Sequence, residues 1–270
     1  MALTFSNLIV NHDDGDAQNY VTASVSPTAN RLELLTVTSY PQSGAAGPTG
    51  VTGNGLTWVQ EGATIAGGNG DYETKWRAMG ASPSSGAITI THGVTQFACA
   101  WSLDESSAEV DTTGTNGSGA CLQSKTGAAN TGGGGGDLTI TLDNALGSPN
   151  NVTHGGFGAN ISTLSAGSGF TLLGSDSAGA AKTLSDYKTN STTAVAHISA
   201  WTIGGIATEV KMAVAVAGTS DRHMPRGLRR GIARGLSNAR EMVQDKINGL
   251  WLPKDRRLVV PVGVSLEGAH

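Results

Sequence analysis

Short apolar or alternating segments, separated by clusters of glycine, proline, asparagine and serine, run from residue 30 to residue 217 of this chain. This pattern is typical of successive antiparallel strands, because side chains alternate between the two faces of a strand and the chain reverses at turn-forming residues. It predicts ten strands, at 31–40, 56–61, 72–79, 87–92, 96–103, 138–142, 152–161, 170–174, 194–203 and 209–217. Ten strands fit an all-β, two-sheet antiparallel sandwich.

Four tryptophans lie inside these segments, and a large ring in a strand more often fills the core than binds a ligand. They are Trp58, Trp76, Trp101 and Trp201. The last predicted strand alternates most clearly, with Val210, Met212 and Val214 on one face and Lys211 and Ala213 on the other. The cysteines Cys99 and Cys121 are predicted to be small buried residues, with a single bridge between them as the alternative.

After residue 217 the apolar positions recur every three or four residues, the spacing of one helix face. They are Leu228, Ile232, Leu236, Ala239, Val243, Ile247 and Leu250. This spacing predicts an amphipathic helix over 226–250, followed by an extended arm that ends at His270. The domain organisation is therefore expected to be a β-sandwich at 1–217, a linker at 218–225 and a basic helix with its arm at 226–270.

The balance of acidic and basic residues also changes after residue 217. Residues 1–217 contain sixteen Asp or Glu against seven Lys or Arg, whereas residues 218–270 contain five against ten. An acidic sandwich is not expected to bind nucleic acid, and a cationic tail is expected to bind an acidic surface.

The predicted partner-binding surface combines tail arginines with the apolar stripe, because arginine donates paired hydrogen bonds to carboxylates or phosphates. Its residues are Arg222, Arg226, Leu228, Arg229, Arg230, Ile232, Arg234, Leu236, Arg240, Val243, Ile247 and Trp251.

Motifs for catalysis and cofactors are absent from the sequence. It contains no Gly-Lys-Ser or Gly-Lys-Thr of a P-loop, no Gly-x-Ser-x-Gly nucleophile turn and no His-Glu-x-x-His pair. We therefore expect a protein that is not an enzyme and has no cofactor. The amino-terminal residues lack the features of a signal peptide, and no apolar stretch is long enough for a membrane span, so no membrane partner is expected.

Two weaker alternatives rest on carboxylates. Asp13, Asp14 and Asp16 gather hard oxygen ligands in a short acidic turn, which makes them a weak calcium candidate; no other metal site is expected. Asp104, Glu105, Glu109 and Asp111 form the densest acidic cluster near a strand end. A pair of these carboxylates could serve a polysaccharide hydrolase, provided that the fold brings two of them together in a cleft.

Five segments of the sandwich region resemble a jelly-roll module of tailed-bacteriophage virion proteins. They are VTGNGLTWV (51–59), RAMG (77–80), SGAITITHG (85–93), AWS (100–102) and VDTTGTNGSGA (110–120), and the resemblance covers residues 30–217. It implies a structural role on the particle, as a capsid decoration protein, a head fibre or a tail-associated protein. It brings no catalytic residues with it.

The resemblance further implies other virion subunits as partners, a homo-oligomer, and assembly into the virion in the host cytoplasm. An alternative function is a tail-associated module that binds a host surface glycan through the loops at 41–55 and 111–136. Tyr40 and Trp58 flank the first of these loops, and sugar sites commonly place an exposed aromatic ring beside polar groups.

Overall fold

The computed structural model describes residues 2–44, 47–68 and 70–213. The chain divides into two units, 1–214 and 215–270, and all of the described residues belong to the first. Their fold is all-β with antiparallel sheets, which confirms the predicted class. Within those residues the one helical element is a 3-10 turn, η1, at Gly132–Gly134.

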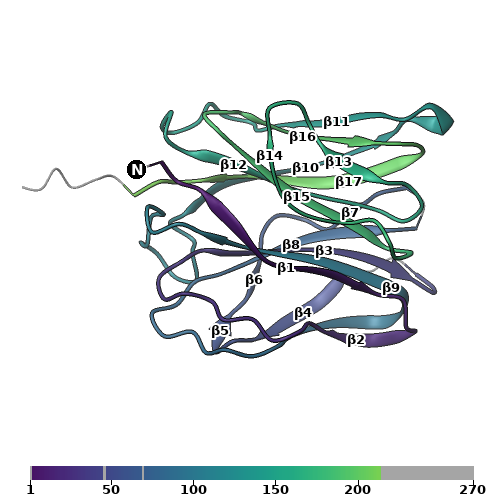
Figure 1. The fold of residues 1–270 in the computed structure, drawn as a ribbon, viewed down its shortest axis with the longest axis horizontal. Helices are drawn as coiled ribbons and strands as arrows, with labels where there is room; N and C mark the ends of the chain where they lie inside the picture. Colours follow the sequence, from purple (N-terminus) through teal and green to yellow (C-terminus); the bar gives the residue numbers. More distant parts are fainter. Residues whose placement is uncertain (1, 45–46, 69, 214–270) are drawn as a thin grey trace, which may run out of the picture. The chain divides into compact units, whose positions relative to one another are not determined.

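The first sheet contains nine strands from the amino-terminal half of the chain (Figure 1). They are β1 (Phe5–Asp13), β2 (Ala17–Val21), β3 (Glu33–Pro41), β4 (Pro48–Gly53), β5 (Leu56–Thr57), β6 (Val59–Gln60), β7 (Ile65–Ala66), β8 (Tyr72–Ala78) and β9 (Ile88–Ser106). Strand β9 pairs with β2 and β4 through its first half and with β1 and β3 through its second half. This change of partners along one strand joins β1, β2, β3 and β4 into a single sheet.

Two further sheets come from the rest of the described chain. The second sheet has the order β10-β17-β12-β15-β14, and the third has the order β11-β16-β13. Their strands are β10 (Cys121–Asn130), β11 (Gly136–Thr141), β12 (Val152–Ala159), β13 (Leu164–Ala166), β14 (Thr171–Asp176), β15 (Lys182–Thr189), β16 (Thr193–Ile198) and β17 (Thr202–Val210). The prediction of two sheets is therefore wrong, since the described residues form three.

Apolar side chains form one core in the first sheet and another between the second and third sheets. The first sheet encloses one core, to which Leu35, Val37, Trp76, Trp101 and Leu103 contribute from β3, β8 and β9. A second core fills the space between the second and third sheets and includes Phe157, Leu184, Ile140, Ala196 and Ile203. Because alternate residues of a strand point to opposite faces, the remaining residues of β3, β8 and β9 face the second sheet.

Several predicted strands are confirmed, and others differ in their bounds. The segments predicted at 87–92 and 96–103 are one strand, β9, because pairing continues while the partners change. Strand β17 begins at Thr202 and ends at Val210, so it overlaps the strand predicted at 209–217 only at its start; residues 214–217 of that prediction lie outside the described residues. Strands β1, β2, β4, β10 and β15 lie in segments where the apolar pattern predicted none.

Among the described residues, no helix has the length and apolar character that crossing a membrane requires.

Candidate functional site

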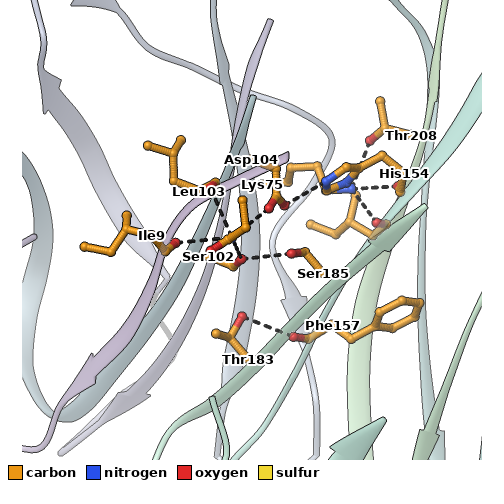
Figure 2. A network of polar contacts seen from close by, with 12 residues as sticks. Ile9, Lys75, Ser102, Leu103, Asp104, His154, Phe157, Thr183, Ser185 and Thr208 are labelled. Carbon is orange, nitrogen blue, oxygen red and sulfur yellow. Dashed lines mark hydrogen bonds and ion pairs between the residues drawn. The ribbon is translucent and has the colours of Figure 1, made fainter. Parts of the chain in front are cut away.

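A buried polar layer lies between the first and second sheets, where alternation of the strands brings hydrophilic side chains face to face (Figure 2). The first sheet contributes Thr36 and Thr38 from β3, Glu73 and Lys75 from β8, and Ser102 and Asp104 from β9. The second sheet contributes His154 from β12, Ser185 from β15 and Thr208 from β17. All nine residues are buried, where a polar group without a hydrogen-bond partner costs free energy.

Asp104 and His154 join the two sheets directly. Nε2 of His154 lies 2.9 Å from Oδ2 of Asp104, and both side chains are fully buried. Burial and then the nearby charge of Lys75 lower the pKa of His154, so the imidazole is neutral at pH 7 and Nε2–H can donate to the carboxylate. Asn7 on β1 donates a second hydrogen bond, of 2.8 Å, to Oδ1 of Asp104.

The side chain of Lys75, on β8 of the first sheet, reaches across the same interface to the backbone of the second sheet. Its Nζ donates to the carbonyl oxygen of Ile206 at 2.7 Å and to that of His154 at 3.0 Å, and it lies 3.4 Å from Oγ1 of Thr208. Burial lowers the pKa of Lys75 to about 8, so the ammonium group is still mostly charged at pH 7. Three acceptors thus surround one buried cation.

Two carboxyl groups in this region are held in their neutral form. Burial, followed by the charge of Asp71, raises the pKa of Glu73 well above its ordinary value. Burial also raises the pKa of Asp186 on β15 to about 8, although the charge of Lys75 opposes the shift. A protonated carboxyl costs far less to bury than an ionised one, which explains how two further acids fit within this interface.

Glycines of the second sheet allow this close approach. A methyl group at Gly156 would overlap Oγ1 of Thr36 and lie 3.0 Å from Cε of Lys75, and one at Gly204 would overlap the carboxyl group of Glu73. The second sheet therefore presents bare backbone where the side chains of the first sheet rest against it. Any larger residue at these positions would separate the sheets.

Apolar clusters close both ends of the polar layer. At one end Leu34 of the first sheet packs with Val152 and Val210 of the second. At the other end Ala98 and Ala100 of β9 pack with Ala181. Ser102 and Ser185, between these ends, bond to each other through their hydroxyl oxygens at 2.8 Å.

The layer contains histidine, aspartate, serine and lysine, but its burial determines what it can do. Its serines are paired with each other rather than with His154, and none of its polar atoms faces solvent. A catalytic group must come within hydrogen-bond reach of a substrate. The geometry therefore makes these residues positioning residues that hold two sheets in register.

The carboxylates predicted for hydrolysis separate in the fold. Asp104 faces the second sheet, whereas Glu105, the next residue of β9, accepts hydrogen bonds from the backbone and hydroxyl group of Thr28. Asp111 forms an ion pair of 2.6 Å with Lys211. Because neighbouring strand residues point to opposite faces, Asp104 and Glu105 do not share a site.

The predicted calcium ligands do not converge. Asp13 accepts a hydrogen bond from the backbone of Gly15, and Asp14 accepts one from the backbone of Ala180. Across the part of the chain that the structure describes, no three His, Cys, Asp or Glu side chains are grouped as a metal ion would require. The two cysteines, on β9 and β10, are both free.

The aromatic residues predicted to bind a glycan have different environments. Trp58 is only 8 % exposed, packs in the first core and donates through Nε1 to the carbonyl oxygen of Gly53. It confirms the prediction of a core ring and excludes an exposed one. Tyr40 is half-buried against Phe97, with ring centroids 5.3 Å apart. Trp201, predicted to be in the core, is 49 % exposed instead.

The predicted partner-binding residues, from Arg222 to Trp251, lie outside the described residues, as do the predicted helix and arm. They stay predictions. Comparison of the chain with protein-family models, with curated proteins and with solved structures found no match.

Proposed function

We propose that this chain is a non-enzymatic structural protein of a tailed-phage virion, of the capsid-decoration or head-fibre type. Its body would be a jelly-roll-like sandwich facing outward, and its basic carboxy-terminal segment would dock onto other virion subunits. The resemblance of residues 30–217 to virion modules supports this proposal. The class of protein rests on that resemblance.

The observation that carries the proposal is the internal use of the ionisable groups. Lys75, Asp104 and His154 are fully buried and bond across the sheet interface, so they serve cohesion rather than chemistry. A buried polar network makes a fold rigid, which is a property that a display scaffold would need.

Attachment would come from the opposite charges of the two parts. The first 217 residues have an excess of nine negative charges, and the remaining 53 have an excess of five positive charges. In the proposed mechanism the apolar stripe of the tail buries against a neighbouring subunit and its arginines pair with that subunit's acids. Repetition of one such contact would give a symmetric oligomer on the particle.

A charge-substitution experiment on the full chain tests this mechanism. Arg229, Arg230 and Arg234 would be replaced together by glutamine, and co-sedimentation with particles from the producing cells would be measured. The proposal expects at least a tenfold loss of bound protein, with partial retention when the same residues become lysine, because lysine keeps the charge but not the paired donors. Unchanged co-sedimentation of the glutamine variant would refute the mechanism.

A further inference from the structure

Trp201 has a backbone conformation that is rare for a bulky residue. Its φ is 69°, in the left-handed region, and its side chain is 49 % exposed. Five non-glycine residues of the described chain have positive φ, and the other four are all asparagines: Asn30, Asn54, Asn116 and Asn190. Asparagine accepts this conformation because its short side chain bonds locally, whereas a tryptophan there is strained.

The backbone around Trp201 is held firmly. Its N–H donates to the carbonyl oxygen of Gly132 at 2.5 Å, and its own carbonyl oxygen accepts from the N–H of Thr131 at 2.7 Å and from Oγ1 of Thr131 at 3.0 Å. These bonds continue the ladder between β10 and β17 by one residue, since Asn130 pairs with Thr202. The indole is therefore presented on a fixed backbone rather than on a loose loop.

Glycine or asparagine would satisfy this turn with less strain, and neither the core nor the sheet interface contains this indole. Local strain at an exposed residue points to a role outside folding, because stability alone favours its removal. An exposed aromatic ring on a rigid backbone is a suitable platform for a ligand with a flat apolar face.

The surroundings of Trp201 indicate which ligand. Three segments meet at this place: 130–136 bonds to Trp201, and 160–163 bonds to Ser199 through Thr163, at 3.1 and 3.2 Å. Together with 199–202, these segments contain no charged residue and are rich in Ser, Thr, Asn and glycine backbone. Ile161, in the second segment, is 57 % exposed. The surface around Trp201 is therefore rich in hydroxyl, amide and peptide groups, and the exposed pair of Asp137 and His197 lies beside it.

We propose that Trp201 and these segments form a binding site for a neutral carbohydrate. The C–H face of a sugar ring stacks on the indole, and its hydroxyl groups bond to the neutral polar groups around it. The net negative charge of the body disfavours an anionic polymer at the same place. This site differs from the one predicted around Trp58, whose ring is buried.

The test is affinity electrophoresis of the full chain in native gels that contain a neutral polysaccharide. Starch, mannan, xyloglucan and hydroxyethyl cellulose would be used as probes. The wild-type chain is expected to be retarded by at least one probe. Trp201→Asn should weaken retardation at least tenfold while its melting temperature stays equal or rises, because asparagine suits the positive φ. The matched control is Leu172→Asn, which alters a different exposed apolar residue, on β14, and should leave retardation unchanged.

Three results would overturn the proposal. One is the absence of retardation by any of the four probes, and another is equal retardation of the Trp201→Asn variant. The third is loss of self-association in size-exclusion chromatography on Trp201→Asn without any effect on retardation, which would assign the ring to a protein contact. Trp201→Gly provides a second variant for the same comparison, since glycine also accepts the conformation.

Discussion

His154 of the second sheet and Asp104 of the first lie 2.9 Å apart across the interface that joins them, and neither side chain is exposed. A pair of this kind adds little stability compared with apolar packing, but breaking it leaves a buried charge without its partner. The edge of the Phe5 ring lies against the imidazole, with centroids 5.1 Å apart, so the pair is shielded from water. The contribution of this pair to the free energy of unfolding can be measured directly.

Removing one acceptor oxygen of Asp104 should destabilise the body strongly. Asp104→Asn replaces one of the two acceptor oxygens with an NH2 group, which then faces the donor of either Asn7 or His154, and we expect a loss of about 3 kcal/mol in the free energy of unfolding. A double-mutant cycle with His154→Gln, measured by denaturant unfolding, should give a coupling energy above ~1 kcal/mol.

The exposed pair His197 and Asp137 is the matched control, since its atoms lie at a similar distance, 2.8 Å, but its side chains are 51 % and 61 % exposed. The same substitutions there should cost roughly 0.5 kcal/mol or less. Equal coupling energies at the two pairs would contradict the importance assigned to burial.

Lys75→Met tests whether the buried cation is needed. Methionine has a similar length, but it leaves the carbonyl oxygens of Ile206 and His154 without their donor. We expect a loss of about 2–4 kcal/mol in the free energy of unfolding. Lys125→Met, at the exposed ion pair with Asp143, should change stability by less than ~1 kcal/mol. A Lys75→Met variant as stable as wild type would show that the sheets do not depend on this group.

Glu33 should make stability depend on pH. Burial, followed by a hydrogen bond with Glu105 and its charge, raises the pKa of Glu33 to about 10, whereas an unfolded glutamate titrates near 4.5. Between these values the native state keeps a proton that the unfolded state loses, so the contribution of Glu33 to stability falls as the pH rises. Glu33→Gln should therefore gain stability over wild type from pH 5 to pH 9.

The measurement is the melting temperature of both chains across that pH range, where ~1 kcal/mol corresponds to roughly 2–4 °C. Asp143→Asn, whose parent side chain is 64 % exposed, is the control and should show no widening difference. A constant difference between Glu33→Gln and wild type would mean that Glu33 is ionised in the fold.

Gly156→Ala should separate the sheets. Its methyl group would overlap Thr36 and press on Lys75, and we expect a loss of about 1–3 kcal/mol in chemical denaturation. Gly50 on β4 offers the matched control, because a methyl group there would meet no atom within 4 Å. Gly50→Ala should be neutral or slightly stabilising. If the two variants lose the same stability, close packing at the interface is not the cause.

The apolar pattern of the sequence predicts some strands of this fold and misses others. Strands with a clear apolar face, such as β3 and β8, were predicted nearly within their true bounds. Strand β10 lacks a fully buried apolar face and was missed, since apolar periodicity has nothing to detect there. Strand β17 was misplaced because Gly204 and Gly205 suggest a break, although Glu73 and Phe157 require glycine at those positions.

The buried layer could not be predicted because its residues also fit a surface. Glu73, Lys75 and Arg77 alternate along one face of β8, a pattern that usually means a strand exposed to water. That face is covered by the second sheet, whose strands come later in the sequence. The exposure of Trp201 could not be predicted either. Trp201 adjoins an apolar run, which favours a core position, and the sequence does not indicate its positive φ.

We propose that residues 1–217 form a scaffold that folds on its own and that residues 218–270 attach it to the particle. The most direct measurement is the incorporation of a chain ending at residue 217 into particles, compared with the full chain by quantitative mass spectrometry of purified virions. We expect the truncated protein to melt within a few degrees of the full chain but to be missing from the particles. Incorporation of the truncated chain at the level of the full chain would refute the attachment role of residues 218–270.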